Sequence, residues 1–201
     1  MQRIYFFILF IVSTLLSGCN FACKKTSSAT IYIQPFYPFS NERALQVAAH
    51  VHKFYHCKVV ILPATAIYEN TKSTDGRYSA AKLLILLNKQ LSDKKAKILG
   101  LTSNDIFCEK HGVKEWGIFG LGYCPGNACI VSDFRLKKFK EKTQEFTINV
   151  VLHELGHTFG LPHCNYNEQC LMNDTKGSIK TLYKEKRLLC SRCSRKIGLA
   201  G

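Results

Sequence analysis

The chemistry-bearing residues of this chain are concentrated between positions 153 and 163. The sequence there reads HELGHTFGLPH, which brings together His153, Glu154, His157 and His163. A helix turns by about 100° per residue, so His153 and His157 fall about 40° apart on one helical face. Two imidazoles one turn apart can share a tetrahedral zinc ion. Glu154 lies beside them, angled away from direct ligation but close enough to act as a general base.

A glycine is expected to end this helix and turn the chain back toward the metal. Gly160 adopts positive φ without steric cost, and Leu161-Pro162 then allow His163 to supply a third nitrogen. Three protein ligands leave the fourth zinc position open for water, which distinguishes a catalytic site from a structural one. Zinc lowers the pKa of such a water from about 15.7 toward 7.

The extended motif is far more specific than its first half. Five fixed positions arise by chance in roughly one chain of this length in ten thousand, whereas a bare His-Glu-x-x-His is much commoner. The alternative interpretation is a pair of core histidines with satisfied hydrogen bonds. The catalytic zinc site is the favoured prediction.

Four cysteines downstream have the spacing of a second, structural metal site. Cys164 follows His163 directly, and neighbouring side chains of an extended segment face opposite ways, so Cys164 points behind the catalytic metal. With Cys170, Cys190 and Cys193 it completes a four-sulfur site that would brace the loop of the third histidine. Disulfides Cys164–Cys170 and Cys190–Cys193 are the alternative, because thiols oxidise outside the cytoplasm.

The N-terminus has the pattern of a targeting segment. Arg3 gives a short positive region, and Ile4–Leu16 is an apolar stretch broken only by Ser13 and Thr14. This stretch is too short for a stable transmembrane span and suits the apolar region of a secretory signal. Residues 1–18 are therefore expected to be a signal peptide.

The end of this segment resembles the bacterial lipobox. Leu16-Ser17-Gly18-Cys19 has a bulky apolar residue, two small residues and a cysteine. In that family of signals the peptide is cut before the cysteine, whose thiol carries a diacylglycerol. The resemblance implies that Cys19 is lipidated, that residues 19–29 are a polar tether, and that the protein is an extracytoplasmic, membrane-anchored bacterial lipoprotein. Which membrane holds it is left open, and an ordinary signal with a coincidental cysteine is the alternative.

Length and composition predict one folded domain, residues 30–201. The chain has 201 residues, of which 46% are hydrophobic, enough for a core of ordinary size. The formal charge of +14 comes from scattered residues with short clusters at Lys137–Lys142 and Lys184–Arg187. Because no basic motif interleaved with aromatic residues occurs, nucleic acid is not an expected partner. A solvated basic surface is favoured, with attraction to anionic lipid as the alternative.

The expected elements form an α/β layer with a mixed sheet that supports a long active-site helix. Asn41 is the expected N-cap of the first helix, and Leu152, Leu155 and Phe159 are expected to pack on the core behind the histidines. The expected strands are Thr30–Gln34, Cys57–Leu62, Lys97–Leu101, Trp116–Tyr123 and Cys129–Val131, and the expected helices are Glu42–Tyr55, Ser79–Leu91 and a helix ending near Phe159.

The remaining cysteines leave several pairings open. Cys124 and Cys129 flank a tight turn between two expected strands and can pair with each other. Cys23, Cys57 and Cys108 are an odd number, so at least one of them stays free or pairs between chains.

The complete pattern resembles the archaemetzincins. That family has the elongated His-Glu motif, a cysteine directly after the third histidine, a Cys-x-Met and a final Cys-x-x-Cys. Here these are Cys164, Cys170-Leu171-Met172 and Cys190–Cys193, and 17 residues separate Met172 from Cys190 as in the family. The motif match covers residues 153–193, with a looser likeness from about residue 97. The spacing between Cys164 and Cys170 is one residue longer than in the family pattern.

The resemblance implies a metzincin-like fold and peptidase activity. It implies a twisted mixed sheet, an active-site helix with a backing helix, and a small cysteine-rich, zinc-bound C-terminal subdomain over residues 164–193. Met172 would be the methionine of the turn beneath the catalytic zinc, and each chain would hold two zinc ions, one catalytic and one structural. Both endopeptidase and aminopeptidase action are compatible with it.

We therefore expect a zinc-dependent peptidase acting on peptides or proteins. Glu154 would take a proton from the attacking water and deliver it to the leaving amine. An extended substrate would lie antiparallel to an edge strand, either Trp116–Tyr123 or Cys129–Val131. The alternatives are a catalytically inactive, zinc-stabilised binding lipoprotein and a zinc-buffering or metal-delivery lipoprotein. An inactive protein is expected to lack the general base, whereas Glu154 is present.

Overall fold

The computed structural model describes residues 29–174 and 187–199. The expected signal peptide, Cys19, Cys23 and nearly all of the expected tether lie outside the described residues. Among the residues that are described, no helix is both long and apolar enough to cross a membrane.

The main sheet has five strands in the order β2-β1-β4-β8-β7. Neighbouring strands run parallel from β2 to β8, and β7 is antiparallel to β8 at the edge of the sheet. The mixed sheet predicted from the sequence is therefore present. The strands are β1 Thr30–Pro35, β2 Lys58–Ile61, β4 Lys97–Thr102, β7 Gly120–Gly122 and β8 Ala128–Ser132.

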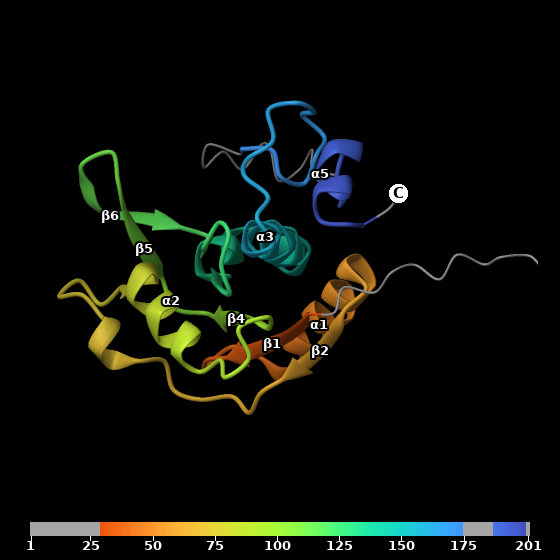
Figure 1. Ribbon diagram of the computed structural model, residues 1–201. Helices are drawn as coiled ribbons and strands as arrows, with labels where there is room; N and C mark the ends of the chain where they lie inside the picture. The colour runs from red at the N-terminus through yellow and green to blue at the C-terminus, as the bar shows by residue number, and fades with distance from the viewer. Residues whose placement is uncertain (1–28, 175–186, 200–201) are drawn as a thin grey trace, which may run out of the picture.

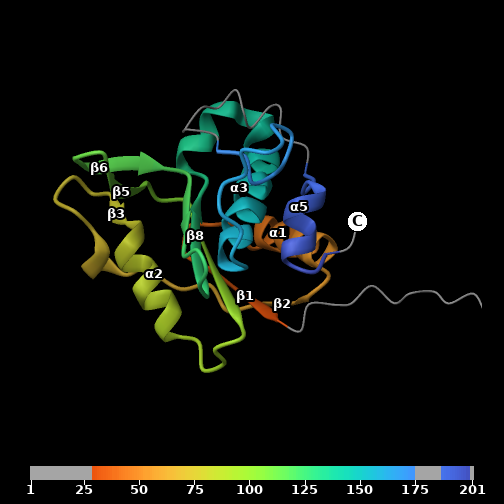
Figure 2. The same ribbon diagram turned by 45° about the horizontal axis from the view of Figure 1, so that its top comes forward.

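Helices cover both faces of this sheet because successive strand residues are buried on opposite sides. Leu99 and Val131 pack with helices α1 (Asn41–Tyr55) and α3 (Thr143–Thr158), whereas Ile98 and Ile130 pack with α2 (Ala80–Lys89) on the other face. Figures 1 and 2 show α1 and α3 together on one side of the sheet and α2 on the other. The result is a three-layer α/β/α arrangement.

A smaller sheet projects beside the main one. It consists of β3 (Tyr78–Ser79), β5 (Ile106–Lys110) and β6 (Val113–Ile118), of which β5 and β6 form an antiparallel hairpin. The prediction of a single strand over Trp116–Tyr123 is wrong, since it divides near Phe119 into β6 of this sheet and β7 of the main sheet. The hairpin was missed because His111-Gly112, both at positive φ, takes the place of the common Asn-Gly or Asp-Gly turn.

Helix α1 backs the active-site helix. Its N-cap is Ser40, whose hydroxyl accepts from the Arg43 amide, so the prediction of Asn41 as cap is wrong by one residue. Arg43 donates to Gln144 at 2.6 Å and forms an ion pair with buried Asp133, tying α1 to the start of α3. Near the other end, the Tyr55 hydroxyl donates to the Leu152 carbonyl. These contacts fix α3 along its length.

Three short helices complete the described part of the chain. They are the 3₁₀ helices η1 (Glu69–Thr71) and η2 (Phe134–Lys142), the second leading into α3, and the helix α5 (Ser191–Lys196) near the C-terminus. Leu161, Cys164, Cys170, Met172 and Cys193 form a small buried cluster that joins the segment after α3 to α5. This cluster corresponds to the expected cysteine-rich subdomain.

Candidate active site

Three histidines meet at the C-terminal part of α3. His153 and His157 lie one turn apart on the helix, with ring centroids 4.7 Å apart. His163 comes from the segment after the helix, and its ring centroid lies 5.4 Å from that of His153 and 4.9 Å from that of His157. One ligand atom of each residue lies within 4.8 Å of the other two. The three predicted ligands therefore converge on one point.

Backbone carbonyls hold two of the imidazoles in one orientation. The Nδ1 of His153 donates to the carbonyl oxygen of Leu171 at 2.7 Å, and the Nδ1 of His157 donates to that of Leu161 at 2.7 Å. Since a carbonyl can only accept, the proton is on Nδ1 and the lone pair of Nε2 is free for a metal. The helix and the loop that follows it thus both determine the ligand geometry.

The surroundings keep these two imidazoles neutral, as metal ligation requires. Burial, followed by the neighbouring His157, lowers the pKa of His153 to about 4. Burial is also the main cause that lowers the pKa of His157. Three imidazoles with an open side are a donor set that suits zinc, so the residues present fit the ion that the motif predicts.

The turn that delivers His163 is a helix-terminating Schellman motif. Gly160 has φ +88°, its amide donates to the His157 carbonyl at 2.8 Å, and the Leu161 amide donates to the Gly156 carbonyl at 3.0 Å. Gly160 therefore ends the helix as the sequence predicts. The half-exposed ring of His163 lies with Nδ1 3.9 Å from a carboxylate oxygen of Asp174.

The side chain of Glu154 extends from α3 toward the edge strand β7. Burial raises the pKa of its carboxyl group to about 8. A Cβ atom at Gly120 would lie 2.7 Å from Glu154 Cγ, and one at Gly122 would lie 2.8 Å from the Glu154 carbonyl oxygen. The two glycines thus allow the helix residue to approach the strand closely.

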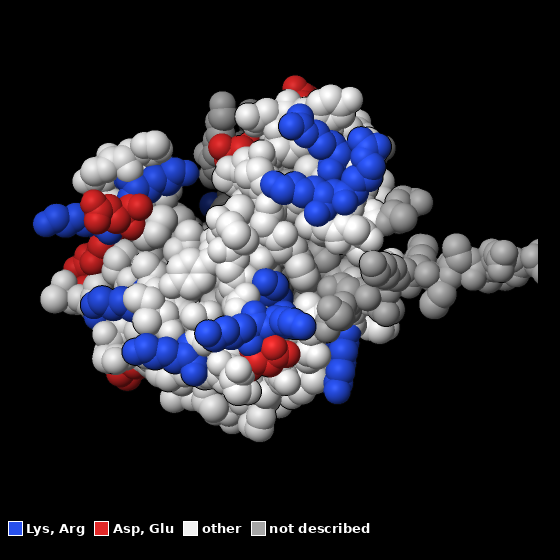
Figure 3. Space-filling model, viewed as in Figure 1, with Lys and Arg blue, Asp and Glu red and all other residues white. Residues whose placement is uncertain are grey.

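The histidines and Glu154 open into one large cleft of about 850 Å³. Its other walls come from the hairpin β5–β6, from β7 and from the start of η2. In Figure 3 the surface is hollowed between the lobe of the hairpin and the lobe that carries α5. The edge strand beside the cleft is β7, so of the two predicted edge segments Cys129–Val131 is wrong, because β8 lies inside the sheet between β4 and β7.

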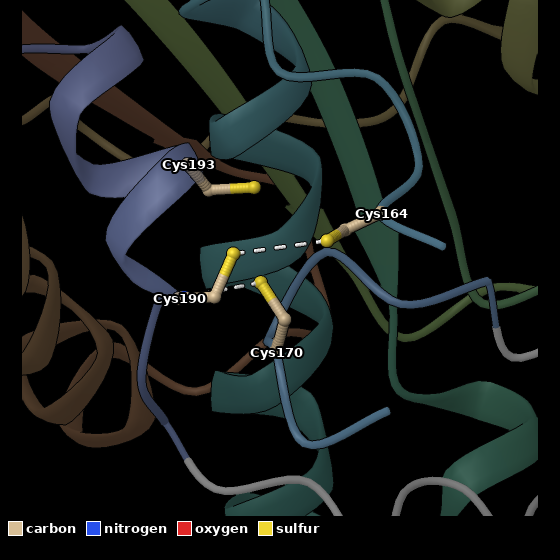
Figure 4. Close-up of side chains that lie close together, drawn as sticks. All are labelled: Cys164, Cys170, Cys190 and Cys193. Carbon is tan, nitrogen blue, oxygen red and sulfur yellow. Dashed lines mark hydrogen bonds between the residues drawn. The ribbon is translucent and has the colours of Figure 1, made fainter. Parts of the chain in front are cut away.

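The four cysteines of the predicted second site also converge (Figure 4). Cys164, Cys170, Cys190 and Cys193 have sulfur atoms within 4.8 Å of one another, and all four are free thiols rather than disulfides. The Sγ atoms of Cys164 and Cys190 are 3.8 Å apart, and the Cys190 amide donates to Cys170 Sγ at 3.3 Å. Although burial acts in the opposite direction, hydrogen bonds from the Cys193 amide and the other thiols lower the pKa of Cys190 to about 7. Four sulfurs in this arrangement suit a structural zinc ion.

The turn around Met172 connects the two clusters. The Cys164 amide donates to the Met172 carbonyl at 2.7 Å, and Leu171 provides the carbonyl that orients His153. The Met172 side chain is fully buried and its sulfur lies against Gly156 of α3. Met172 therefore packs against the active-site helix, next to the residue whose carbonyl orients His153.

The chain matches a known family of peptidases. The family model of peptidase family M54 matches residues 39–198. The chain belongs to peptidase family M54. Its curated relatives are archaemetzincins: the Halobacterium salinarum protein is 29% identical over 166 residues, covering 76% of this chain and 90% of the relative. The Methanopyrus kandleri archaemetzincin is 34% identical over 120 residues, covering 59% of this chain and 65% of the relative.

Solved archaemetzincins have the same fold. The Archaeoglobus fulgidus crystal structure, a complex with malonate, has a TM-score of 0.70 and 25% identity, covering 84% of this chain and 99% of that one. The Methanopyrus kandleri structure has a TM-score of 0.70 and 27% identity, covering 86% and 95%. The chain is thus a zinc metallopeptidase of the archaemetzincin family, a hydrolase of peptide or protein substrates, and its mixed α/β fold is similar to that of the solved archaemetzincins.

Several residues around the site were not found from the sequence. Cys108 and Arg135 line the cleft, and Lys97 donates to the Thr158 carbonyl at the end of α3 at 3.0 Å. None of these has a local motif, because each reaches the site only through tertiary contacts. Cys124 and Cys129, whose pairing was open, are free thiols, and Cys124 Sγ donates to the Leu161 carbonyl at 3.4 Å.

Proposed function

We propose that the archaemetzincin described here hydrolyses peptide bonds at the three-histidine site, with Glu154 as general base and acid. The observation that carries the proposal is that the ligand atoms of His153, His157 and His163 converge while Glu154 opens into the same cleft. Zinc held by the three imidazoles would polarise the scissile carbonyl and acidify a water molecule.

Glu154 has the environment that a proton carrier needs. In the cleft its carboxylate would accept a proton from the attacking water as the new C–O bond forms. The carboxyl would then pass that proton to the amine nitrogen as the C–N bond breaks, returning to its initial state. Burial raises the pKa of Glu154 to about 8 in the metal-free site, and a cation held by the three imidazoles would lower it toward neutral pH, so that both the carboxylate and the carboxyl of this cycle are accessible there.

The edge strand β7 offers a backbone template for the substrate. In the described part of the chain, β7 is the last strand of the main sheet and lines the cleft beside Glu154. An extended peptide antiparallel to β7 would hydrogen-bond to its free backbone edge, a recognised form of peptide binding. Because the glycines of β7 have no side chains, they leave this edge accessible next to Glu154.

The second zinc ion is proposed to be structural, held by Cys164, Cys170, Cys190 and Cys193. The convergence of the four sulfurs supports it, and no open position for substrate is then needed. We expect two zinc ions per chain by metal analysis, one of which is released by thiol-modifying reagents. The alternative of an inactive binding lipoprotein is not favoured, because the general base is present in the cleft.

A lipid anchor is the second part of the proposal and rests on the sequence alone. Leu16-Ser17-Gly18-Cys19 supports cleavage before Cys19, lipidation of its thiol and an extracytoplasmic, membrane-anchored location. Mass spectrometry of the full chain expressed in a bacterium should find acyl groups on Cys19 and the protein in the membrane fraction. Cys19→Ala should move it out of that fraction; a processed chain with an unmodified Cys19 would contradict the proposal.

The decisive experiment for the catalytic role is Glu154→Gln. This change removes the proton acceptor but keeps the size of the side chain, so we expect kcat to fall by about 10²- to 10⁴-fold, the usual contribution of a general base. Zinc content should stay unchanged by metal analysis. Glu145→Gln, in the exposed first turn of the same helix, is the matched control. Full activity in the Glu154→Gln protein would end the assignment.

A further inference from the structure

We propose that the hairpin β5–β6 forms a specificity subsite for a large apolar, preferably aromatic, side chain of the substrate. This inference rests on the proposed peptidase function and adds to it the class of peptide that is cut. Its starting point is Trp116, the only tryptophan of the chain. Trp116 lies on β6, is 44% exposed, and lines the cleft that contains Glu154.

One face of the hairpin carries the apolar wall. The strand register pairs Cys108 directly with Trp116, and Ile118 lies two residues further along β6, so the three side chains share one face. All three line the cleft, as does Phe134 at the start of η2, which is 48% exposed. Large apolar side chains left exposed within a concave site are typical of ligand-binding surfaces.

An ion pair fixes this wall from behind. The Arg135 guanidinium donates from Nε and Nη2 to both carboxylate oxygens of Asp105, at 2.7 and 2.8 Å. It lies flat against β6 at Gly117, where a Cβ atom would overlap the guanidinium. The glycine therefore permits a contact that joins β6 to η2.

A second ion pair holds the outer side of the hairpin. Arg77 donates to the Glu115 carboxylate at 2.8 Å and to the Glu115 carbonyl at 3.0 Å. Its guanidinium also lies over the ring of Phe107, 5.5 Å from the centroid. A wall held at both ends is preorganised, so little conformational entropy is lost when a substrate side chain packs on it.

The charges around the wall do not favour a charged occupant. Glu109 and Lys110 are neighbours of opposite sign at the tip of the hairpin, and both line the cleft. The guanidinium of Arg135 is already engaged with Asp105, and the ammonium of Lys138, which also lines the cleft, lies over the ring of Phe139. An aromatic ring, by contrast, can pack on Trp116 edge-to-face or offset, which adds to the gain from burying apolar surface.

The test compares peptides that differ in one residue near the scissile bond, with Phe, Ala or Glu placed in turn at each flanking position. For the zinc-loaded full chain we expect kcat/KM for the best Phe peptide to exceed that for its Ala counterpart by about tenfold or more. Trp116→Ala should bring this ratio close to one, and Trp116→Phe should keep the ratio near the wild-type value. Val113→Ala, on the same strand and 46% exposed but outside the cleft lining, should leave the ratio unchanged.

Fluorescence separates this subsite from the catalytic proposal. In the Glu154→Gln protein the emission of Trp116 should change on titration with the Phe peptide and not with the Glu peptide. If no peptide is cut by the wild type but this emission change occurs, the subsite stands and the peptidase proposal fails. If peptides are cut with equal kcat/KM for Phe and Ala, or the ratio survives Trp116→Ala, the subsite is overturned and the peptidase proposal stands.

Discussion

At the scale of single residues, the candidate site is made of groups that burial keeps uncharged. Burial lowers the pKa of His153 to about 4 and raises the pKa of its neighbour Glu154 to about 8. Both shifts favour the neutral form, one by disfavouring proton uptake and the other by disfavouring proton loss. The site is thus suited to a cation, which the free Nε2 lone pairs would coordinate. The charge of the cation would favour the ionised form of Glu154 over the protonated form.

These shifts predict how the stability of the metal-free protein depends on pH. Glu154 has a higher pKa in the folded than in the unfolded chain, so its contribution is present at low pH and lost as pH rises through about 8. His153 has a lower pKa in the folded chain, so it destabilises the fold only below about pH 6.5. Between pH 6.5 and 8 the Glu154 effect therefore acts without opposition from His153. We expect this effect to lower the free energy of unfolding by up to about 2 kcal/mol, at about 1.36 kcal/mol per pH unit. The lowered pKa of Cys190 acts in the opposite direction above about pH 7, so the Glu154 effect is measured as the difference between the wild type and Glu154→Gln.

Urea unfolding of chelator-treated protein at pH 6.5 and 8 measures this difference. Glu154→Gln should remove most of it, because glutamine has no proton to lose. Glu145→Gln should leave it in place, since Glu145 lies in the exposed first turn of α3. An equal pH effect in the wild type and the Glu154→Gln protein would show that another group is responsible.

At the scale of elements, the site was predictable where its geometry is local. The spacing of His153 and His157, and the positive φ of Gly160, determine α3 and its end without reference to the rest of the chain. The hairpin β5–β6 was not predictable, because its turn at His111-Gly112 lacks the usual signature and its pairing is a tertiary contact. For the same reason the cleft wall around Trp116 and Arg135 appears only in the folded structure.

The edge strand β7 gives a prediction that separates activity from stability. In Gly120→Ala the new Cβ meets the flexible Glu154 side chain, 2.7 Å from Cγ, so the carboxylate should shift while the fold holds. A displacement of about 1 Å can cost about 100-fold, so we expect kcat to fall by about 10- to 100-fold at unchanged zinc content. In Gly122→Ala the Cβ meets the Glu154 backbone carbonyl, which cannot yield, so the protein should lose about 1–3 kcal/mol of stability.

Thermal unfolding, metal analysis and peptide cleavage on both glycine variants check this contrast. Each variant adds one methyl group to the same strand, at a different position, so each serves as the control for the other. Equal losses of stability, or full activity in Gly120→Ala, would contradict the idea that β7 positions Glu154.

At the scale of the whole molecule, a shared turn couples the two candidate metal sites. The segment around Met172 contributes the carbonyl that orients His153, and Cys164 directly follows His163. Exposed basic residues of α5, including Arg192, Arg195 and Lys196, surround the cysteine cluster, and a group of Lys and Arg side chains covers this lobe in Figure 3. Four thiolates around a divalent cation carry a net charge of −2, which these cations would offset.

This coupling predicts that loss of the cysteine site damages the histidine site at a distance. Cys193→Ser removes one sulfur from the first turn of α5 without changing the cleft, because Cys193 does not line the cleft. We expect zinc content to fall from two ions to one, and stability to fall by several kcal/mol, since structural zinc contributes directly to folding. The loop of His163 should then be less ordered, lowering kcat/KM by about tenfold or more.

Cys124→Ser is the control that shows whether the cluster, rather than any cysteine, is responsible. Cys124 is an exposed free thiol outside the cluster, and a serine hydroxyl can donate to the Leu161 carbonyl as its Sγ does. This variant should keep both zinc ions and its melting temperature. If Cys193→Ser also keeps both ions, the four-sulfur site does not bind zinc. If it loses one ion but keeps full kcat/KM, the histidine loop is ordered without help from the cysteine cluster, and the two sites are independent.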